Sequence, residues 1–206
     1  MAEPAVAFGA AVNPQSLAVI LAHGRGRSPE DMIGLAERMA LPGLAYVAPP
    51  APDGSWYPER FMASVAANQP HLDLALDRID SEVRALEALG CRRERIALVG
   101  FSQGACLVSE YLYRHPGRWA GLIAFTGGLI GPEDVVWDRV GNLEGTPVLL
   151  SSGDADPWVP WERIEATADV LAGLGARVSL KMRQGSEHVV SDEEIAAGRA
   201  LLAACS

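Results

Sequence analysis

The sequence has 206 residues, of which 49% are hydrophobic and 21% are charged, and its formal net charge is −9. This balance is typical of a globular protein and too apolar for a disordered chain. It argues against a nucleic-acid partner, because such binding requires a concentrated basic surface that 17 Lys and Arg residues do not readily supply. The length favours one domain over two, so we expect a single domain over residues 1–206.

The sequence predicts neither a membrane segment nor a disulfide framework. No apolar run reaches the roughly 18 residues that cross a bilayer, and no basic segment opens the chain as in a signal peptide. We therefore expect no stable membrane insertion. Cys91, Cys106 and Cys205 are odd in number and widely spaced, which fits neither paired disulfides nor a C-x-x-C metal site. A cytoplasmic setting is the simplest expectation, and both a monomer and a homodimer are compatible with the sequence.

Short apolar runs rich in β-formers alternate with longer helical patterns along the chain. This alternation predicts a mostly parallel, twisted sheet with helices on both faces. The predicted strands cover residues 17–22, 44–48, 96–100, 122–126, 148–152 and 178–182.

Helix signals fill the intervals between these strands. Ser28 precedes a proline and two acidic residues, which predicts a helix from there to about Met39. Apolar residues spaced by three and four predict a second helix that starts near His71 and ends at Gly90. Further helices are expected over residues 103–115, 161–172 and 192–204. The proline-rich segment 48–60 is expected to be an ordered loop.

A serine flanked by glycines, in the motif G-F-S-Q-G, marks the junction between the third predicted strand and its helix. In this context Ser102 is predicted to sit in a tight turn that lifts its hydroxyl above the sheet, with Gly100 and Gly104 allowing close packing. The helix N-terminus would also favour an oxyanion nearby. The alternative is a simple packing corner in which Ser102 caps the helix.

A nucleophilic serine requires a base and an orienting acid later in the chain. Asp156 directly follows the fifth predicted strand and His188 follows the sixth. Because loops after parallel strands share one sheet edge, we expect Ser102, Asp156 and His188 to converge as a catalytic triad. Asp154, two residues earlier, is the competing acid, and each of these residues also has a structural alternative in a turn or on the surface.

An oxyanion intermediate would need two preorganised donors. One is the backbone N–H of Gln103, directly after the proposed nucleophile, and the other is expected from the loop H-G-R-G after the first predicted strand. The most plausible donor there is the backbone N–H of Arg25. A phosphate cradle is the alternative for this loop, but it lacks the Lys and Ser/Thr of a P-loop.

With HGRG, GFSQG, GDADPWVP and GSEH in this order, the sequence resembles the phospholipase/carboxylesterase family of small α/β-hydrolases, which includes the acyl-protein thioesterases. The resemblance implies an α/β-hydrolase fold with Ser102 as nucleophile, His188 as general base and Asp156, rather than Asp154, as its orienting acid. It also implies the Arg25 and Gln103 N–H groups as the oxyanion hole. Members of the family need no metal or cofactor.

The departures from this family concern the substrate. Arg25 stands where an apolar residue is usual, so its side chain is expected to favour a substrate with an anion near the ester. Trp56, Tyr57, Phe61 and Trp158 are expected to wall a compact aromatic pocket, with ordinary packing as the alternative for each. No insertion is long enough for a separate lid domain.

These residues predict a serine carboxylesterase that hydrolyses small-molecule esters of short to medium acyl length through an acyl-enzyme on Ser102. Thioesters and lysophospholipids are alternative substrates. Two rival classes stay open, a lyase on the same fold and a non-hydrolytic ligand-binding protein. Covalent labelling by a fluorophosphonate distinguishes the hydrolase from a binder.

Overall fold

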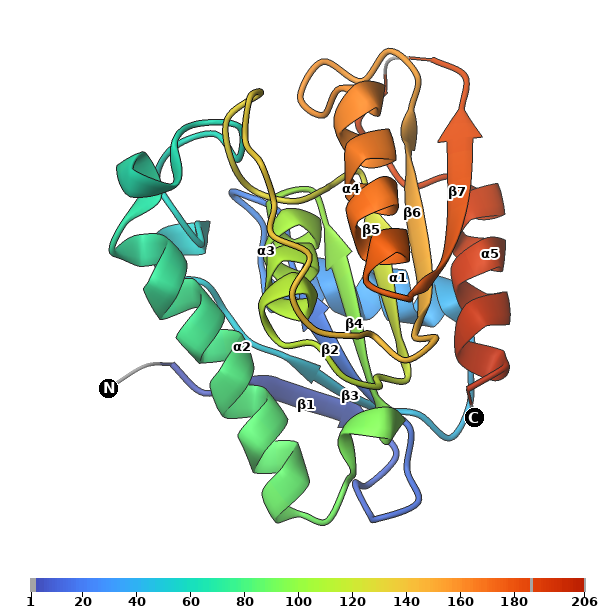
Figure 1. Cartoon of the computed structure of the whole chain (residues 1–206). Coiled ribbons are helices and arrows are strands. Elements are labelled where there is room, and N and C mark those ends of the chain that lie inside the picture. Colours follow the sequence, from blue (N-terminus) through green and yellow to red (C-terminus); the bar gives the residue numbers. More distant parts are fainter. Residues whose placement is uncertain (1–2, 186, 206) are drawn as a thin grey trace.

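The computed structural model describes residues 3–185 and 187–205. Within these residues, seven strands form one sheet in the order β1-β3-β2-β4-β5-β6-β7 (Figure 1). The pair β1 and β3 is antiparallel, and every other pair of neighbouring strands is parallel. The parallel strands are β2 (Ala18–Ala22), β3 (Ala45–Ala48), β4 (Ile96–Phe101), β5 (Gly121–Phe125), β6 (Pro147–Gly153) and β7 (Arg177–Arg183). The six predicted strands are therefore confirmed to within one residue at each end.

The edge strand β1 (Val6–Gly9) was not predicted from the sequence. It has only four residues, alternates between half-buried and exposed positions, and pairs antiparallel with β3. So short a strand carries too few residues for its alternation to be recognised. Its partner strand is also distant in the sequence, because Gly9 pairs with Ala45, roughly 36 residues later.

In the described part of the chain, five α-helices cover the two faces of the sheet, as the sequence predicts. They are α1 (Pro29–Met39), α2 (His71–Ala88), α3 (Gln103–Arg114), α4 (Trp161–Gly173) and α5 (Asp192–Ala203). The buried residues of α2, α3 and α4 form one core with the sheet, and those of α1 and α5 form a second core on the opposite face. Short 3₁₀ segments, η1 (Pro52–Gly54), η2 (Val65–Asn68) and η3 (Arg93–Arg95), lie in the connections.

The inner strand β2 shows why the strands of this sheet have continuously apolar sequences. All five of its residues are buried, with Ala18, Ile20 and Ala22 in the core of α2, α3 and α4, and Val19 and Leu21 in the core of α1 and α5. A strand covered on both faces has no polar side, so its sequence lacks the alternation of a half-exposed strand.

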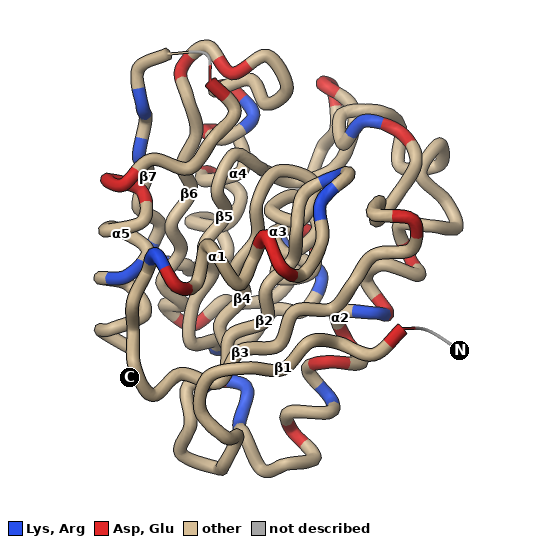
Figure 2. Tube along the Cα trace, turned by 180° about the vertical axis from the view of Figure 1, so that it is seen from behind, with Lys and Arg blue, Asp and Glu red and all other residues tan. Residues whose placement is uncertain are grey.

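Most charged residues lie on the surface, and Glu110, Asp156, Arg163 and Glu194 are buried. Seen from behind, Lys and Arg positions are interspersed with Asp and Glu positions along the tube (Figure 2). No helix in the described part of the chain is both long enough and apolar enough to cross a membrane.

The turn between β4 and α3 depends on two glycines. A methyl group added to Gly104 would overlap the Ala22 carbonyl oxygen at the end of β2, and one added to Gly100 would lie 2.5 Å from the Ala105 backbone nitrogen. Both contacts are with backbone atoms that cannot rotate away. The first turn of α3 can therefore approach β2 and β4 this closely only because these positions carry no side chain.

We expect Gly104→Ala to lower the free energy of unfolding by at least about 2 kcal/mol, because overlap with fixed backbone atoms forces the helix to move. Gly34→Ala is the matched control. Gly34 is also helical, and nothing lies within 4 Å of its added methyl carbon, so the control should gain up to about 1 kcal/mol. Urea denaturation measures both values, and equal stability of Gly104→Ala and wild type would contradict the close contact.

Candidate active site

Ser102 occupies the turn between β4 and α3 in an unusual backbone conformation. Its φ is 54° and its ψ is −119°, a positive φ that is sparsely populated for a residue with a side chain. The Ser102 N–H donates to the Phe125 carbonyl over 2.9 Å, and the Cys106 N–H donates to the Ser102 carbonyl over 3.0 Å. The hydroxyl makes no capping hydrogen bond to α3. The turn thus holds the hydroxyl away from the helix and available to another group.

Ser102, His188 and Asp156 form a continuous chain of hydrogen-bonding groups. His188 Nε2 lies 2.8 Å from Ser102 Oγ, and His188 Nδ1 lies 2.7 Å from Asp156 Oδ2. The Asp156 side chain is fully buried, and its other oxygen accepts from the backbone N–H groups of Trp158 and Val159. These two donors compensate the buried carboxylate and fix its orientation toward the imidazole.

Asp154 has a different position from Asp156. Its carboxylate accepts from the Gly185 N–H over 2.8 Å, and its own N–H donates to the Arg183 carbonyl. It therefore ties the loop after β6 to the loop that carries His188, without reaching the imidazole itself. Ser186 of that loop, part of the G-S-E-H motif, lies outside the described residues.

The loop after β2 brings Arg25 close to Ser102. A methyl group added to Gly24 would lie 3.3 Å from Ser102 Cβ, which makes the two segments direct neighbours. Within the described residues, the backbone N–H groups of Arg25 and Gln103 donate no hydrogen bond to the protein. Both donors are free to bind a ligand atom beside Ser102.

The Gln103 side chain holds the loop over residues 51–59. Its Oε1 accepts from the Trp56 N–H over 3.0 Å, and its Nε2 donates to the Tyr57 carbonyl over 2.8 Å and to Ser55 Oγ over 3.3 Å. Gln103 is buried, so these bonds satisfy its amide. This role could not be read from the G-F-S-Q-G motif, because it depends on a loop almost 50 residues earlier.

Arg25 binds the same loop from the other side. Its guanidinium donates to the carbonyl oxygens of Pro58 and Glu59, each over 2.6 Å, and lies 6.0 Å from the centre of the Tyr57 ring. The Gly26 N–H adds a bond to the Gly54 carbonyl. Two of the five N–H donors of Arg25 are therefore occupied by the protein, and its side chain braces the loop against the turn at Gly24–Gly26.

His23 is a further site residue whose role was not predicted. Its Nε2 accepts from the Ala51 N–H over 3.0 Å, so Nδ1, 2.8 Å from the Gly24 carbonyl, carries the proton. Burial lowers the pKa of His23 below its ordinary value of 6.5. The neutral ring thereby joins the turn after β2 to the start of the loop over residues 51–59.

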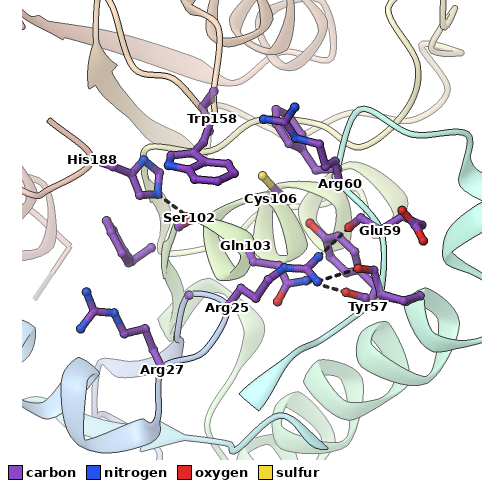
Figure 3. Close-up of a pocket in the computed structure, with 15 residues that line it drawn as sticks. Arg25, Arg27, Tyr57, Glu59, Arg60, Ser102, Gln103, Cys106, Trp158 and His188 are labelled. Atoms are coloured by element: carbon purple, nitrogen blue, oxygen red, sulfur yellow. Dashed lines mark hydrogen bonds between the residues drawn. The ribbon is translucent and has the colours of Figure 1, made fainter. Parts of the chain in front are cut away.

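A cavity of about 490 Å³ opens beside Ser102 (Figure 3). Tyr57, Phe61 and Trp158 line it, as expected from the sequence, and so does Cys106 from the second turn of α3. Burial raises the pKa of the Cys106 thiol to about 12, so this thiol stays protonated at neutral pH. Aromatic and charged side chains both line this cavity, and Ser102 and His188 are among its lining residues.

The expectation that Trp56 lines the pocket is wrong. Trp56 is 2% exposed, its indole N–H donates to the His23 carbonyl, and its ring lies 5.1 Å from the His23 ring. The side chain points under the loop because its N–H finds a buried acceptor there. It is part of the packing that supports the cavity, and not of the cavity itself.

A second, smaller hollow of about 340 Å³ lies on the other side of His188. Both hollows are lined by Gly24, Arg27, Phe101 and His188, and the smaller one extends over α1 and the residues that follow His188. No group of three or more His, Cys, Asp or Glu side chains suited to a metal ion occurs in the described part of the chain. His188 thus lines both hollows, and Ser102 lines the larger one.

Comparisons with known proteins agree on one family. A model of the family described as Phospholipase/Carboxylesterase matches residues 4–206. An acyl-protein thioesterase 1 of Gibberella zeae is 33% identical over 105 residues, which cover 50% of this chain and 44% of the fungal protein. A probable carboxylesterase of Oryza sativa subsp. japonica is 27% identical over 195 residues, which cover 86% of this chain and 83% of the rice protein.

One similar solved structure covers almost the whole chain. The crystal structure of a phospholipase/carboxylesterase from Dyadobacter fermentans superposes with a TM-score of 0.91 at 39% identity, over 97% of this chain and 96% of that one. The match to the fungal thioesterase, by contrast, spans less than half of that protein's length.

The buried His23 predicts a stability that falls in mild acid. Below pH 6.5 the unfolded chain binds a proton that the folded chain resists, so the free energy of unfolding should fall as the pH drops from 7 toward 5. The slope contributed by His23 is at most about 1.4 kcal/mol per pH unit. Urea denaturation at several pH values should show this slope reduced in His23→Gln and retained in His71→Gln, since His71 is exposed. Identical slopes in both variants would exclude His23 as the source.

Proposed function

Because the chain belongs to the phospholipase/carboxylesterase family, we propose that it is a serine carboxylesterase that hydrolyses short- to medium-chain esters through an acyl-enzyme on Ser102. Relatives named carboxylesterase and acyl-protein thioesterase support a hydrolase of carboxylic esters or thioesters. The observation that carries the serine mechanism is the chain of short contacts from Asp156 through His188 to Ser102.

In the first half of the reaction, Ser102 Oγ attacks the acyl carbon while His188 Nε2 accepts the hydroxyl proton. The bond from the acyl carbon to the leaving oxygen or sulfur then breaks, and the imidazolium delivers its proton to that atom. Asp156 orients the ring and stabilises the imidazolium, because its buried carboxylate bonds Nδ1. The product of this half is the ester of Ser102 and the released alcohol or thiol.

In the second half, water replaces the leaving group. His188 Nε2 accepts a proton from the water as its oxygen bonds the acyl carbon, and the same proton returns to Ser102 Oγ when the acyl–serine bond breaks. Both halves pass through an oxyanion, for which we propose the unoccupied N–H groups of Arg25 and Gln103 as donors. Their side chains brace one loop, which supports a preorganised pair.

The cavity supports the proposed range of acyl lengths. A volume of about 490 Å³ with Tyr57, Phe61 and Trp158 on its wall suits an acyl group of short to medium length, bound mainly by apolar contact. The same attack at an acyl carbon releases a thiol from a thioester, so thioesters remain within the proposed chemistry. A ligand-binding protein would not require the serine, imidazole and buried carboxylate in this alignment.

Ser102→Ala should lower kcat for p-nitrophenyl butyrate by about 10⁴- to 10⁶-fold, because the acyl-enzyme cannot form. The variant should keep its fold, which circular dichroism and thermal unfolding check. Mass spectrometry should find a fluorophosphonate on the Ser102 peptide of the wild type only. Persistent hydrolysis by a folded Ser102→Ala would refute the mechanism.

Two neighbouring aspartates provide a matched test of the acid. Asp156→Asn should lower kcat about 10⁴-fold, since an amide donating to His188 disfavours the tautomer that accepts the Ser102 proton. Asp154→Asn should lower it by less than about tenfold, because Asp154 bonds the Gly185 N–H and not the imidazole. Steady-state kinetics compare the two, and a larger effect at Asp154 would reverse the assignment.

A further inference from the structure

Three arginines surround the cavity of this acidic protein. Arg25, Arg27 and Arg60 line it, and Glu59 is the one acidic residue among the described lining residues. Figure 3 shows the Glu59 carboxylate directed away from Ser102. The chain as a whole carries a formal net charge of −9, so the positive charge at this cavity is local and runs against the overall balance. Such a setting favours an anionic ligand.

The three guanidinium groups differ in how many hydrogen bonds and ion pairs they make with the protein. Arg25 donates to the Pro58 and Glu59 carbonyl oxygens, so two of its five N–H donors already bond to the loop over residues 51–59. Arg27 forms an ion pair with Asp31, with 3.5 Å between Arg27 Nη1 and Asp31 Oδ1. Arg60, among the described residues, has no hydrogen-bond or ion-pair partner for its side chain, and its guanidinium carbon lies 5.4 Å from the centre of the Trp158 ring.

This contact leaves Arg60 suited to bind a carboxylate. The guanidinium carbon lies over the indole at a cation–π distance, and its N–H groups have no partner among the described residues, so they can make a bidentate contact with two oxygens. The attraction of the indole favours this position of the guanidinium, which lowers the entropy lost on binding. The backbone of Trp158 is held by the bond from its N–H to Asp156 Oδ1, while the residue as a whole is 58% exposed.

The two hollows indicate which half of a substrate meets Arg60. The leaving group must receive a proton from His188 Nε2, and His188 lines both hollows. The smaller hollow extends from the imidazole over α1, away from Arg60, and can hold the leaving group there. The acyl chain then occupies the larger cavity with Tyr57 and Trp158 on its wall. Arg60 lines the larger cavity and not the smaller one.

We propose that the acyl group of the substrate ends in a carboxylate that Arg60 binds, so that the substrates are half esters or half thioesters of dicarboxylic acids. This proposal rests on the esterase function proposed above. Hydrolysis consumes one water and yields the dicarboxylate, the free alcohol or thiol and one proton, with Ser102 and His188 acting as in the neutral case. Arg60 takes no part in the proton transfers and determines specificity.

The test compares two substrates that differ at the far end of the acyl chain, which is an ionised carboxylate in one and its neutral methyl ester in the other. These are mono-p-nitrophenyl adipate and p-nitrophenyl methyl adipate, with Ser102→Ala as the blank for spontaneous hydrolysis. Wild type should favour the charged substrate in kcat/KM, and Arg60→Gln should lower the ratio of charged to neutral substrate by about 10- to 100-fold, the range for a charge-assisted bidentate contact. Arg60→Lys should fall between them, because it keeps the charge and loses the planar fork.

Arg92→Gln is the matched control. Arg92 precedes β4 at its amino end, opposite the sheet edge that carries Ser102, and its removal changes the net charge by the same amount. This variant should keep the wild-type ratio. Equal ratios in wild type and Arg60→Gln would overturn the proposal. A third ester with a neutral acyl chain and a carboxylate on its phenol should not depend on Arg60, and if it does, the assignment of the acyl side is wrong.

Binding separates this proposal from the esterase function. Isothermal titration calorimetry of adipate with Ser102→Ala should show about tenfold or more weaker binding when Arg60→Gln is added, and no change with Arg92→Gln. Loss of Arg60-dependent adipate binding in a protein that hydrolyses p-nitrophenyl esters would overturn only the anion site. Adipate binding through Arg60 in a wild type that hydrolyses no ester would overturn only the esterase function.

Discussion

The close contact between the first turn of α3 and the end of β2 is the constraint on which the site depends. With no side chains at Gly100 and Gly104, the helix backbone packs directly against the strands, and Ser102 at the corner is forced to a positive φ. The same contact places the helix N-terminus beside the turn after β2, where Gly24 lies against Ser102 and where the residues of the two proposed donors, Arg25 and Gln103, line the same cavity as the serine. One steric requirement therefore accounts for the exposure of the hydroxyl, the strain of its backbone and the nearness of both proposed donors.

Polar side chains, buried at His23 and Gln103 and exposed at Arg25, then hold the surrounding loops in place. His23, Gln103 and Arg25 each bond backbone groups of the loop over residues 51–59, and each of them lies in or beside the turns that flank Ser102. A loop that carries the pocket wall through Tyr57 would otherwise leave several backbone groups without partners. The neutral state of His23 belongs to this arrangement, because only an unprotonated Nε2 can accept from the Ala51 N–H. The polar residues beneath the cavity are thus structural, although they lie within a few residues of the proposed chemistry.

The elements and turns that depend on residues close together in the chain could be predicted from the sequence. The side-chain directions that depend on contacts between distant residues could not. The parallel strands, the five helices and the turn at Ser102 follow from local patterns of apolar residues, glycines and caps, and all were predicted. The order Ser102, Asp156, His188 could also be proposed, because strand ends share one edge. The direction of the Trp56 ring could not, since a polar acceptor on His23 decides it 33 residues away along the chain. The same holds for Arg25, whose charge is visible in the sequence while the carbonyl oxygens that occupy it are not.

The loop after β6 links the proposed chemistry to the proposed specificity. The Trp158 N–H donates to the carboxylate that orients His188, and the Trp158 ring lies against Arg60 on the wall of the cavity. The backbone of this residue thus serves the acid of the triad while its side chain serves the pocket. Specificity can change through the side chain at position 158 without disturbing the carboxylate, because any residue other than proline supplies the same N–H. A change in the length of this loop, by contrast, would move the carboxylate, the imidazole and the pocket wall together. Variation in substrate range is therefore expected at the side chains of positions 60 and 158, with the backbone around Asp156 retained.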